Sequence, residues 1–214
     1  MLTGQSHTMT ARKALDTALV LHAEHGFNAS TFSARVTAST RSDLHSAVVA
    51  AISTLKGPLH GGANRAVMAA LEEIGDVSRV EAAVKDRLRR RERIMGFGHR
   101  VYKTMDPRAV HLKEMARVLG EERGDTRWYE MSARMEEIVF REKGLYPNVD
   151  FYSAAAYRSL EIPAAIYPAV FACSRIAGWA AHIMEQNADN RLIRPRAEYV
   201  GPSPRRFLPL SERG

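Results

Sequence analysis

His60 has the residue type and the neighbours expected of a neutral hydrogen-bond donor. It lies in the sequence GPLHGGAN at residues 57–64, directly before a predicted helix. The partial positive charge of a helix N-terminus disfavours a protonated imidazole, so we expect His60 to be neutral near pH 7. A neutral imidazole can donate a hydrogen bond to an oxygen on which negative charge develops. A tight turn between two helices that carries an incidental histidine remains an alternative.

His99 lies among positive charges. It belongs to the sequence IMGFGHRVY at residues 94–102, next to Arg100, and the sequence DPR with Arg108 follows shortly after. A histidine flanked by arginines suits an anionic ligand. The Gly-x-Gly spacing is too short for a dinucleotide fingerprint, and no strand is predicted before it. A loop whose charges are simply solvated is the alternative interpretation.

Asp150 is a carboxylate in an otherwise apolar and aromatic segment, LYPNVDFYS at residues 145–153. Partial desolvation raises the pKa of a carboxyl group, so Asp150 could act as a base. Aspartate is also a frequent helix N-cap, and both roles are compatible with this sequence.

A metal site is not predicted. His22 and His25 are close in sequence, but their spacing is not the His-Glu-x-x-His spacing of zinc proteases. The chain has one cysteine, Cys173, which excludes an internal disulfide and indicates a reducing, cytoplasmic environment.

Helices are predicted to position all of these side chains, because apolar residues recur at helical spacing along most of the chain. We find no alternating strand and no internal repeat, so the sequence predicts an all-α fold. A tail that begins near Pro195 and contains Pro202, Pro204 and Pro209 is expected to be irregular. Helix starts are predicted near Ala11, Ser42–Asp43, Ala63, Ser78, Asp106–Pro107, Trp128, Asp150 and Ala164, and helix ends near Gly75, Gly120, Gly144, Pro163 and Asn187.

The net charge of +7 and the pI of about 9.8 favour an anionic partner, either a nucleic acid or a small anionic substrate. The densest basic run, residues 87–93, is interrupted by Glu92 and follows Asp86, and it has no aromatic residues for base stacking. We therefore expect a solvated helix face there and no nucleic-acid partner.

The composition and the first residues also bear on location. The 214 residues are 45% apolar, which suits a globular protein of one domain, or of one large and one small domain. No run reaches the roughly 18 apolar residues of a membrane span. The start, Met1-Leu2-Thr3-Gly4, has neither a basic nor an apolar region, so no signal peptide is predicted.

The chain resembles the citrate synthase family, which includes 2-methylcitrate synthases. The similarity extends from about Leu15 to Gly201. It depends on five motifs in the family's order and spacing, LHAEHGFNASTFSARV, GPLHGGAN, IMGFGHRVYKTMDPRA, YPNVDFYSA and RLIRPRAEYVGP.

The resemblance implies a role for each of the three candidate residues. Asp150 would remove a proton from the methyl carbon of acetyl-CoA. His60 would donate a hydrogen bond to the thioester oxygen and stabilise the enolate. His99 would polarise the keto group of oxaloacetate and assist its protonation as the new bond forms, before the citryl thioester is hydrolysed.

The resemblance also implies residues that bind the substrates, and acyl-CoA as a co-substrate in place of a tightly bound cofactor. In the family, the arginine that matches Arg194 reaches the partner's active site, which implies a homodimer. Arg175 lies in a strongly apolar helix, which favours a paired, functional arginine. The implied dicarboxylate ligands are His25, Arg108, Arg175 and Arg194, and the implied coenzyme A contacts are Met95, Gly96, Phe97, Gly98, Lys103 and Asn148.

The chain is shorter than members of the family usually are. We expect a complete small helical domain at residues 61–157 and an incomplete large domain at residues 1–60 and 158–214. Apolar faces within residues 15–21 and 164–184 would then lack a cover, which predicts self-association, or pairing with a longer homologue or with the missing N-terminal half.

The predicted function is condensation of acetyl-CoA with oxaloacetate and water to give citrate and CoA, the entry to the tricarboxylic acid cycle. Two alternatives remain. One is a 2-methylcitrate synthase that uses propionyl-CoA. The other is a truncated, non-catalytic paralogue that binds CoA or a dicarboxylate.

Overall fold

The fold is built from helices. The computed structural model describes Gly4, residues 6–203 and residues 206–213. Over these residues it contains helices and one isolated β-bridge, between Phe97 and Pro147, and no strand. The prediction of an all-α fold is therefore confirmed. Residues 1–3, on which the signal-peptide prediction depends, and Pro204 of the tail lie outside the described residues.

The α-helices of the described chain are α1 Met9–His22, α2 Ala29–Ser39, α3 Leu44–Leu55, α4 Ala63–Ile74, α5 Val80–Arg89, α6 Pro107–Arg123, α7 Arg127–Lys143, α8 Val149–Ser159 and α9 Tyr167–Ala188. Short 3-10 helices are η1 Val77–Arg79, η2 Ala164–Ile166 and η3 Leu210–Glu212.

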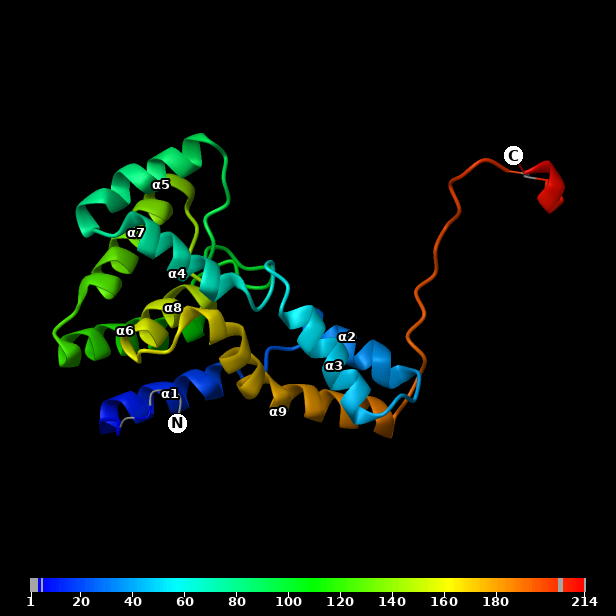
Figure 1. The fold of residues 1–214 in the computed structure, drawn as a ribbon, viewed down its shortest axis with the longest axis horizontal. Coiled ribbons are helices and arrows are strands. Elements are labelled where there is room, and N and C mark those ends of the chain that lie inside the picture. The colour runs from blue at the N-terminus through cyan, green and yellow to red at the C-terminus, as the bar shows by residue number, and fades with distance from the viewer. Residues whose placement is uncertain (1–3, 5, 204–205, 214) are drawn as a thin grey trace.

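Buried side chains form two apolar clusters that correspond to two lobes (Figure 1). The larger cluster joins α4–α8 with the start of α9, and it includes Ala14 and Ala18 of α1. The smaller cluster joins α2, α3 and α9, with Trp179 and Ile183 at its centre. Helix α9 contributes to both clusters and therefore links the two lobes.

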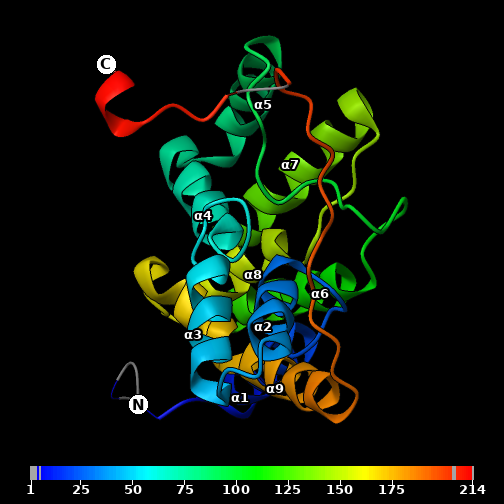
Figure 2. The same ribbon diagram turned by 90° about the vertical axis from the view of Figure 1, so that its right-hand side faces the viewer.

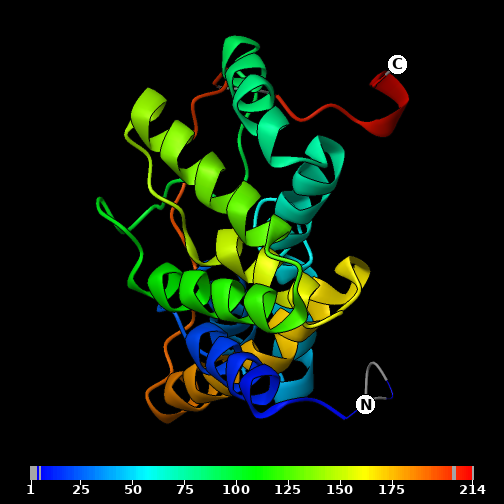
Figure 3. The same ribbon diagram turned by 90° about the vertical axis from the view of Figure 1, so that its left-hand side faces the viewer.

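The packing of the lobes is clear from the sides of the molecule. Helices α2 and α3 lie side by side and pack on α9 (Figure 2). On the opposite side, α6 packs against α7, α8 and α1 (Figure 3). In the described part of the tail, Ile193 N–H still donates to Ser39 at the end of α2. The described chain that follows runs irregularly away from the lobes, as the prolines predict, except for the short turn of η3.

Several predicted helix ends are confirmed. Asp106 caps α6, with Pro107 at the first helical position. Gly75 and Gly144 follow α4 and α7 in the left-handed conformation that glycine adopts without steric cost. The predicted end of α6 at Gly120 is wrong, because the helix continues to Arg123 and Gly124 adopts the left-handed conformation instead.

Three further predictions differ from the structure. The sequence predicts no helix over Ala29–Ser39, yet α2 forms there with Asn28 as its N-cap. The arginine-rich helix starts at Val80 and not at Ser78, since η1 precedes it. Asp150 is not an N-cap. Asn148 caps α8 and accepts a hydrogen bond from the Asp150 backbone N–H.

Close contact between α9 and the end of α1 requires a glycine. A Cβ atom at Gly178 would lie 2.3 Å from the carbonyl oxygen of Ala23 and 3.3 Å from the Cα of Glu24. The glycine thus lets α9 contact the backbone that leads into α2. This contact matters for the site, because His25 lies in the same connection.

Large apolar side chains are exposed on the lobe formed by α2, α3 and α9. In the two segments predicted to lack a cover, Val20, Ile176 and Met184 are exposed, whereas Leu15, Leu19 and Leu21 pack partly against the larger cluster. Helices α2 and α3 also expose apolar residues, which the sequence does not predict. These residues are Phe32, Leu44, Val49 and Ile52.

One helical stretch, Ala164–Ala188, is long and apolar enough to cross a membrane by length and composition alone. A single stretch of this kind is weak support for a span, because the core helix of a globular domain passes the same test. Here the stretch packs against α1, α2 and α3 and buries Trp179 and the charged Arg175.

Candidate functional site

A cavity of about 910 Å³ lies where both lobes contribute side chains. Its walls come from the α1–α2 connection, the loop before α4, the loop before α6, and the helices α6, α8 and α9. The structure therefore brings together residues that are up to 150 positions apart in sequence. Its lining includes the predicted residues His25, His60, Phe97, Gly98, His99, Arg108, Asn148, Asp150 and Arg175.

His60 is held by the N-terminus of α2. Its Nε2 accepts a hydrogen bond from the Ser30 backbone N–H (3.3 Å) and lies 2.8 Å from the Ser30 hydroxyl. A backbone N–H can only donate, so the proton of the neutral ring is on Nδ1. Burial, together with the charge of Arg175, lowers the pKa of His60 to about 4. His60 is therefore a neutral donor, although the helix terminus that contacts it is that of α2 and not the predicted one of α4.

His99 has a defined tautomer for the same reason. Its Nδ1 accepts hydrogen bonds from the backbone N–H groups of Val101 (3.0 Å) and Tyr102 (3.2 Å). The proton therefore lies on Nε2, which points to Nε2 of His25 at 3.2 Å. Burial lowers the pKa of His99. The geometry makes His99 Nε2–H a neutral donor.

His25 extends the row of neutral rings. It accepts the hydrogen bond from His99 and lies against Tyr102, with ring centroids 5.6 Å apart. Burial lowers the pKa of His25 to about 4, and the positive charge of Arg108 acts in the same direction. A histidine that stays neutral at neutral pH can hydrogen-bond a carboxylate without adding to the positive charge that the arginines already supply.

Asp150 is a buried carboxylate that lacks full hydrogen bonding. It is the second residue of α8, and its Oδ1 is buried without a hydrogen-bond partner among the described residues. Burial raises the pKa of Asp150 to about 6, while the charges of Arg108 and Arg175 oppose the rise. An unpaired oxygen with a raised pKa is what a general base near neutral pH requires.

Arg108 is oriented by a second carboxylate, Asp106. The pair is bidentate, with Arg108 Nε and Nη2 at 3.0 and 2.8 Å from the two Asp106 oxygens. Asp106 is 1% exposed and also accepts a hydrogen bond from the Val149 backbone N–H at the start of α8. One buried carboxylate thereby fixes both Arg108 and the helix that carries Asp150.

Arg175 is buried and forms no ion pair with any described residue. It is 1% exposed, its Nε donates to the carbonyl oxygen of His22 at 2.6 Å, and its guanidinium lies over the ring of Phe171. Its Nη1 is buried without a partner. Burial lowers the pKa of Arg175 to about 10, and the charge of Arg108 contributes to this. An unpaired buried cation that lines a cavity is suited to bind an anion there.

The loop that carries His99 is tied to the loop that precedes α8. Gly98 N–H donates to Tyr146 O (2.9 Å), Asn148 N–H to Gly96 O (2.9 Å), and the Asn148 side chain to Gly98 O (3.0 Å). Gly96 has a φ of +85°, and a Cβ there would lie 2.8 Å from Phe151 and Val67. These contacts fix the two walls of the cavity relative to each other.

The remaining predicted residues lie elsewhere. Lys103 lines a separate pocket of about 210 Å³ that shares His99 with the main cavity. Met95 packs partly against the larger apolar cluster, and neither Met95 nor Gly96 is among the residues that line the two cavities. Arg194 is exposed in the tail, where it donates to Pro195 O, and the fold does not bring it into the cavity of its own chain.

Sequence reasoning missed several residues of the site. Ser30 fixes His60, Asp106 fixes Arg108, and Arg93 and Phe171 line the cavity. The cap sequence Asn28-Ala-Ser could have indicated a helix start next to His25, but nothing in the sequence relates Ser30 to His60.

Part of the arginine cluster is paired with acidic side chains. Arg87 contacts Glu73, while Arg89 and Arg90 contact Asp86. The basic run therefore has less excess charge than the sequence indicates. The described residues contain no group of three or more histidine, cysteine, aspartate or glutamate side chains that could hold a metal ion.

Comparisons with known proteins place the chain in one family. The family described as citrate synthase, C-terminal domain, matches residues 1–196. The chain is 54% identical over 212 residues to citrate synthase 2 of Bacillus subtilis, covering 99% of the chain and 57% of that protein. It is 46% identical over 213 residues to the 2-methylcitrate synthase of Shewanella oneidensis, covering 100% and 57%. The chain thus spans 57% of the length of these two relatives.

Solved structures give the same result. The citrate synthase of Thermoplasma acidophilum, in a ternary complex with carboxymethyl coenzyme A and oxaloacetate, superposes with a TM-score of 0.89 at 43% identity, covering 99% of this chain and 57% of that one. Citryl-CoA lyase of Hydrogenobacter thermophilus superposes with a TM-score of 0.81 at 32% identity, covering 98% and 84%. The predicted resemblance is confirmed, and the chain belongs to the citrate synthase family, corresponding to its C-terminal domain.

Proposed function

We propose that the protein condenses acetyl-CoA with oxaloacetate and water to give citrate and CoA. The observation that carries this proposal is the unpaired Oδ1 of Asp150, which lies in the same cavity as two neutral imidazole donors, His60 and His99. A base and two donors suit a reaction in which a carbon-bound proton is removed while negative charge develops on two carbonyl oxygens.

Each step of the proposed condensation is assigned to a residue whose chemistry suits it. Asp150 takes a proton from the methyl carbon of the thioester, and the electron pair moves to the thioester oxygen, where His60 Nδ1–H stabilises it. The resulting enolate carbon attacks the keto carbon of oxaloacetate. Oxaloacetate replaces His25 as the acceptor of the His99 Nε2–H, which donates a hydrogen bond to the keto oxygen while His99 keeps its proton. The alkoxide that forms becomes a hydroxyl group by taking a proton from water. Water then cleaves the citryl thioester and releases citrate and CoA.

Charge supports a dicarboxylate as the second substrate. Arg108 and Arg175 bring two guanidinium groups to the cavity wall, and the buried Nη1 of Arg175 has no partner among the described residues. We assign one carboxylate of oxaloacetate to these arginines and to His25. Arg194 is proposed to bind in the cavity of a second chain. The coenzyme would lie along the Met95–His99 loop near Asn148, with Lys103 at its phosphates.

The assembly is part of the proposal. We propose a small domain at residues 61–157 and an incomplete large domain at residues 1–60 and 158–214. The exposed apolar residues of α2, α3 and α9 support association with a second copy, a longer homologue or a separate N-terminal half. A cytoplasmic location is proposed from the single cysteine, which indicates a reducing compartment.

Other reactions of the same site remain candidates. Propionyl-CoA in place of acetyl-CoA would make the chain a 2-methylcitrate synthase, supported by its 46% identity to the Shewanella protein of that name. Cleavage of citryl-CoA is a further candidate, because this chain covers 84% of the length of the citryl-CoA lyase that it resembles. A non-catalytic paralogue that binds CoA or a dicarboxylate is the alternative outside catalysis.

Release of free CoA tests these candidates. The purified chain is incubated with acetyl-CoA or propionyl-CoA, with and without oxaloacetate, and thiol formation is followed. Release that depends on oxaloacetate supports condensation, and the preferred thioester distinguishes the two synthases. Formation of acetyl-CoA from citryl-CoA alone supports the lyase. No turnover of any of the three thioesters by folded protein would contradict catalysis by this chain.

The pH dependence of turnover is expected to follow Asp150. The base must be ionised, and burial raises its pKa to about 6, so kcat/KM should fall as the pH drops through about 6 and level off above pH 7. His25 and His60, with pKa values of about 4, stay neutral over this range. The measurement is the rate of CoA release between pH 5 and 9 at constant ionic strength. A rate that stays level from pH 7 down to pH 5 would contradict the assignment of the base.

A further inference from the structure

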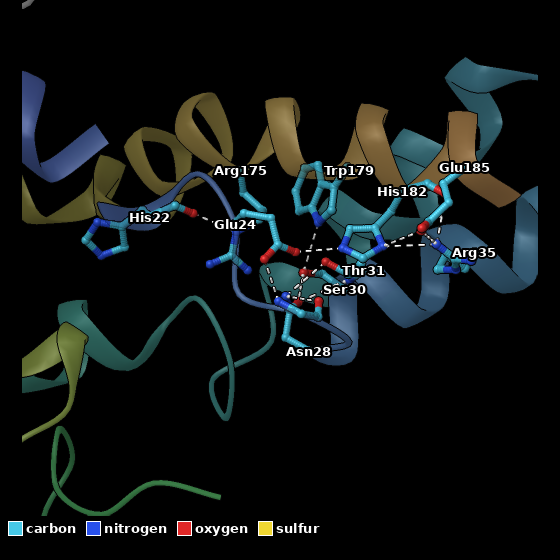
Figure 4. A network of polar contacts seen from close by, with 11 residues as sticks. His22, Glu24, Asn28, Ser30, Thr31, Arg35, Arg175, Trp179, His182 and Glu185 are labelled. Carbon is cyan, nitrogen blue, oxygen red and sulfur yellow. Dashed lines mark hydrogen bonds and ion pairs between the residues drawn. The ribbon is translucent and has the colours of Figure 1, made fainter. Parts of the chain in front are cut away.

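The connection between α1 and α2, residues 23–28, carries His25 but is held in place from α9. Glu24 accepts two hydrogen bonds there. Its Oε2 accepts from the Gly26 backbone N–H at 2.7 Å, and its Oε1 lies 2.6 Å from Nε2 of His182 (Figure 4). Both carboxylate oxygens of Glu24 are therefore used to fix the backbone on either side of His25.

Arg35 determines which group donates in the contact between His182 and Glu24. Its Nη1 lies 3.1 Å from Nδ1 of His182, and a guanidinium group can only donate. His182 Nδ1 therefore accepts, its proton is on Nε2, and Nε2 donates to Glu24. Arg35 is held in turn by Glu185 (2.5 Å) and by Gln186 Oε1 (3.1 Å), so the row of contacts runs from α2 across α9 to the connection (Figure 4).

The row ends at the cavity, although His182 does not line it. Glu24 precedes His25, whose Nε2 contacts His99 at 3.2 Å. Beyond this contact, the ring of His25 has only ring-stacking neighbours among the described residues, namely His99 and Tyr102. The direction of the His25 side chain therefore depends on the backbone of residues 23–28, and this backbone depends on Glu24.

We infer that His182, fixed between Arg35 and Glu24, is a positioning residue that holds His25 in the orientation needed to bind the dicarboxylate. The inference rests on the proposed function, because that proposal makes His25 a ligand of oxaloacetate. His182 acts through Glu24 and does not itself touch the substrate. Its loss should weaken dicarboxylate binding while leaving the coenzyme side of the cavity unchanged.

Titration calorimetry of the whole chain with oxaloacetate tests the inference. His182→Ala should raise the Kd for oxaloacetate about tenfold, as expected for the loss of one hydrogen bond to a charged group. His182→Gln should restore the Kd to within about threefold of the parent, because the amide can still donate to Glu24. His45→Ala removes a histidine side chain that is 96% exposed on α3, and it should leave the Kd unchanged.

Glu24→Gln is an independent variant. Gly26 and His182 contact different oxygens of Glu24, and in glutamine one of these positions becomes an NH2 group that donates. One of the two hydrogen bonds is therefore lost, and a similar tenfold rise in the oxaloacetate Kd is expected. If circular dichroism shows that His182→Ala does not fold, Glu24→Gln still tests the inference. The Kd for CoA should change less than twofold in each variant.

The outcomes are distinguishable. If the parent binds oxaloacetate and both Glu24→Gln and the folded His182 variants bind it equally well, the inference is wrong while the proposed function stands. If His182→Gln is as weak as His182→Ala, or if CoA binding weakens in parallel, the residue has only a structural role and the inference is wrong. A folded parent that does not bind oxaloacetate contradicts both.

Discussion

Asp150→Asn is expected to lower the rate of CoA release by a factor of about 10² to 10⁴, the usual contribution of a general base. The substitution keeps the shape of the side chain but removes its ability to accept a proton. Oxaloacetate should bind with a Kd within about threefold of the parent, because the proposed dicarboxylate ligands Arg108, Arg175 and His25 are unchanged. A large loss of rate with little loss of binding is the result that identifies a base.

The same substitution is expected to stabilise the fold at neutral pH. Burial raises the pKa of Asp150 from 3.8 to about 6, so the ionised carboxylate is disfavoured in the folded state. A shift of this size corresponds to at most about 3 kcal/mol. Because the folded pKa is raised, the native protein loses this stability as the pH rises from about 4 to about 6. The increase in the free energy of unfolding caused by Asp150→Asn should therefore be small at pH 4 and reach its maximum by pH 7.

Two measurements on Asp150→Asn test the expected loss of rate and gain in stability. They are CoA release in the presence of oxaloacetate and chemical denaturation at pH 4 and pH 7. Asp16→Asn is the matched control, because Asp16 is an exposed aspartate on α1. It should change neither the rate of CoA release nor the free energy of unfolding. Residual activity equal to that of the parent would show that this chain is not the catalyst. A variant that is inactive and also less stable than the parent at pH 7 would contradict the picture of Asp150 as an unsatisfied buried base.

The helices were largely predictable because several have a cap or a stop in their own sequence. Asp106 and Pro107 start α6, and Gly75 and Gly144 end α4 and α7. Helix α2 was missed because its buried face consists of small residues such as Ala34 and Ala38, which give a weak periodic signal. Gly120 was taken for a helix end, but it lies inside α6, where a Cβ would be 3.1 Å from the Asp125 carbonyl.

The candidate site was predictable by residue type but not by contact. Local sequence indicates that His60, His99 and Asp150 could do chemistry, and the resemblance supplied their roles. Their protonation depends on partners that are distant in sequence. Ser30 sets the tautomer of His60 over a separation of 30 residues. Nothing local shows that Arg175 would be buried without an ion pair among the described residues, since that depends on how α9 packs against α1.

Ionisation of Asp106 has the opposite effect on stability to ionisation of Asp150, although the charge of Arg108 acts on both carboxyl groups. Asp106 has all its main acceptor positions used, by the side chain and backbone N–H of Arg108 and by the backbone N–H of Val149. Burial alone would raise the pKa of Asp106, but the hydrogen bonds and charge of Arg108 outweigh it, so the pKa lies below its ordinary value. The ionised form of Asp106 therefore stabilises the fold.

Asp106→Asn is accordingly expected to lower the free energy of unfolding by about 3–5 kcal/mol at pH 7, because it leaves Arg108 largely buried without its counter-ion. It should also weaken catalysis, since Arg108 and the start of α8 lose their common anchor. Asn is as good a helix cap as Asp, so loss of capping does not explain the effect. Asp43→Asn tests this directly at the exposed N-cap of α3, and it should leave the free energy of unfolding close to that of the parent.

Chemical denaturation of Asp106→Asn, Asp43→Asn and the parent as a function of pH gives the decisive comparison. The folded pKa of Asp106 is depressed, so its stabilising effect is fully present above the unfolded value of 3.8 and is lost as the pH falls through the lower folded value. The difference between the parent and Asp106→Asn should therefore be constant from pH 5 to 8 and shrink below pH 4. A loss under about 1 kcal/mol at pH 7, or a loss that persists undiminished at pH 2.5, would show that the Asp106–Arg108 pair does not anchor the site.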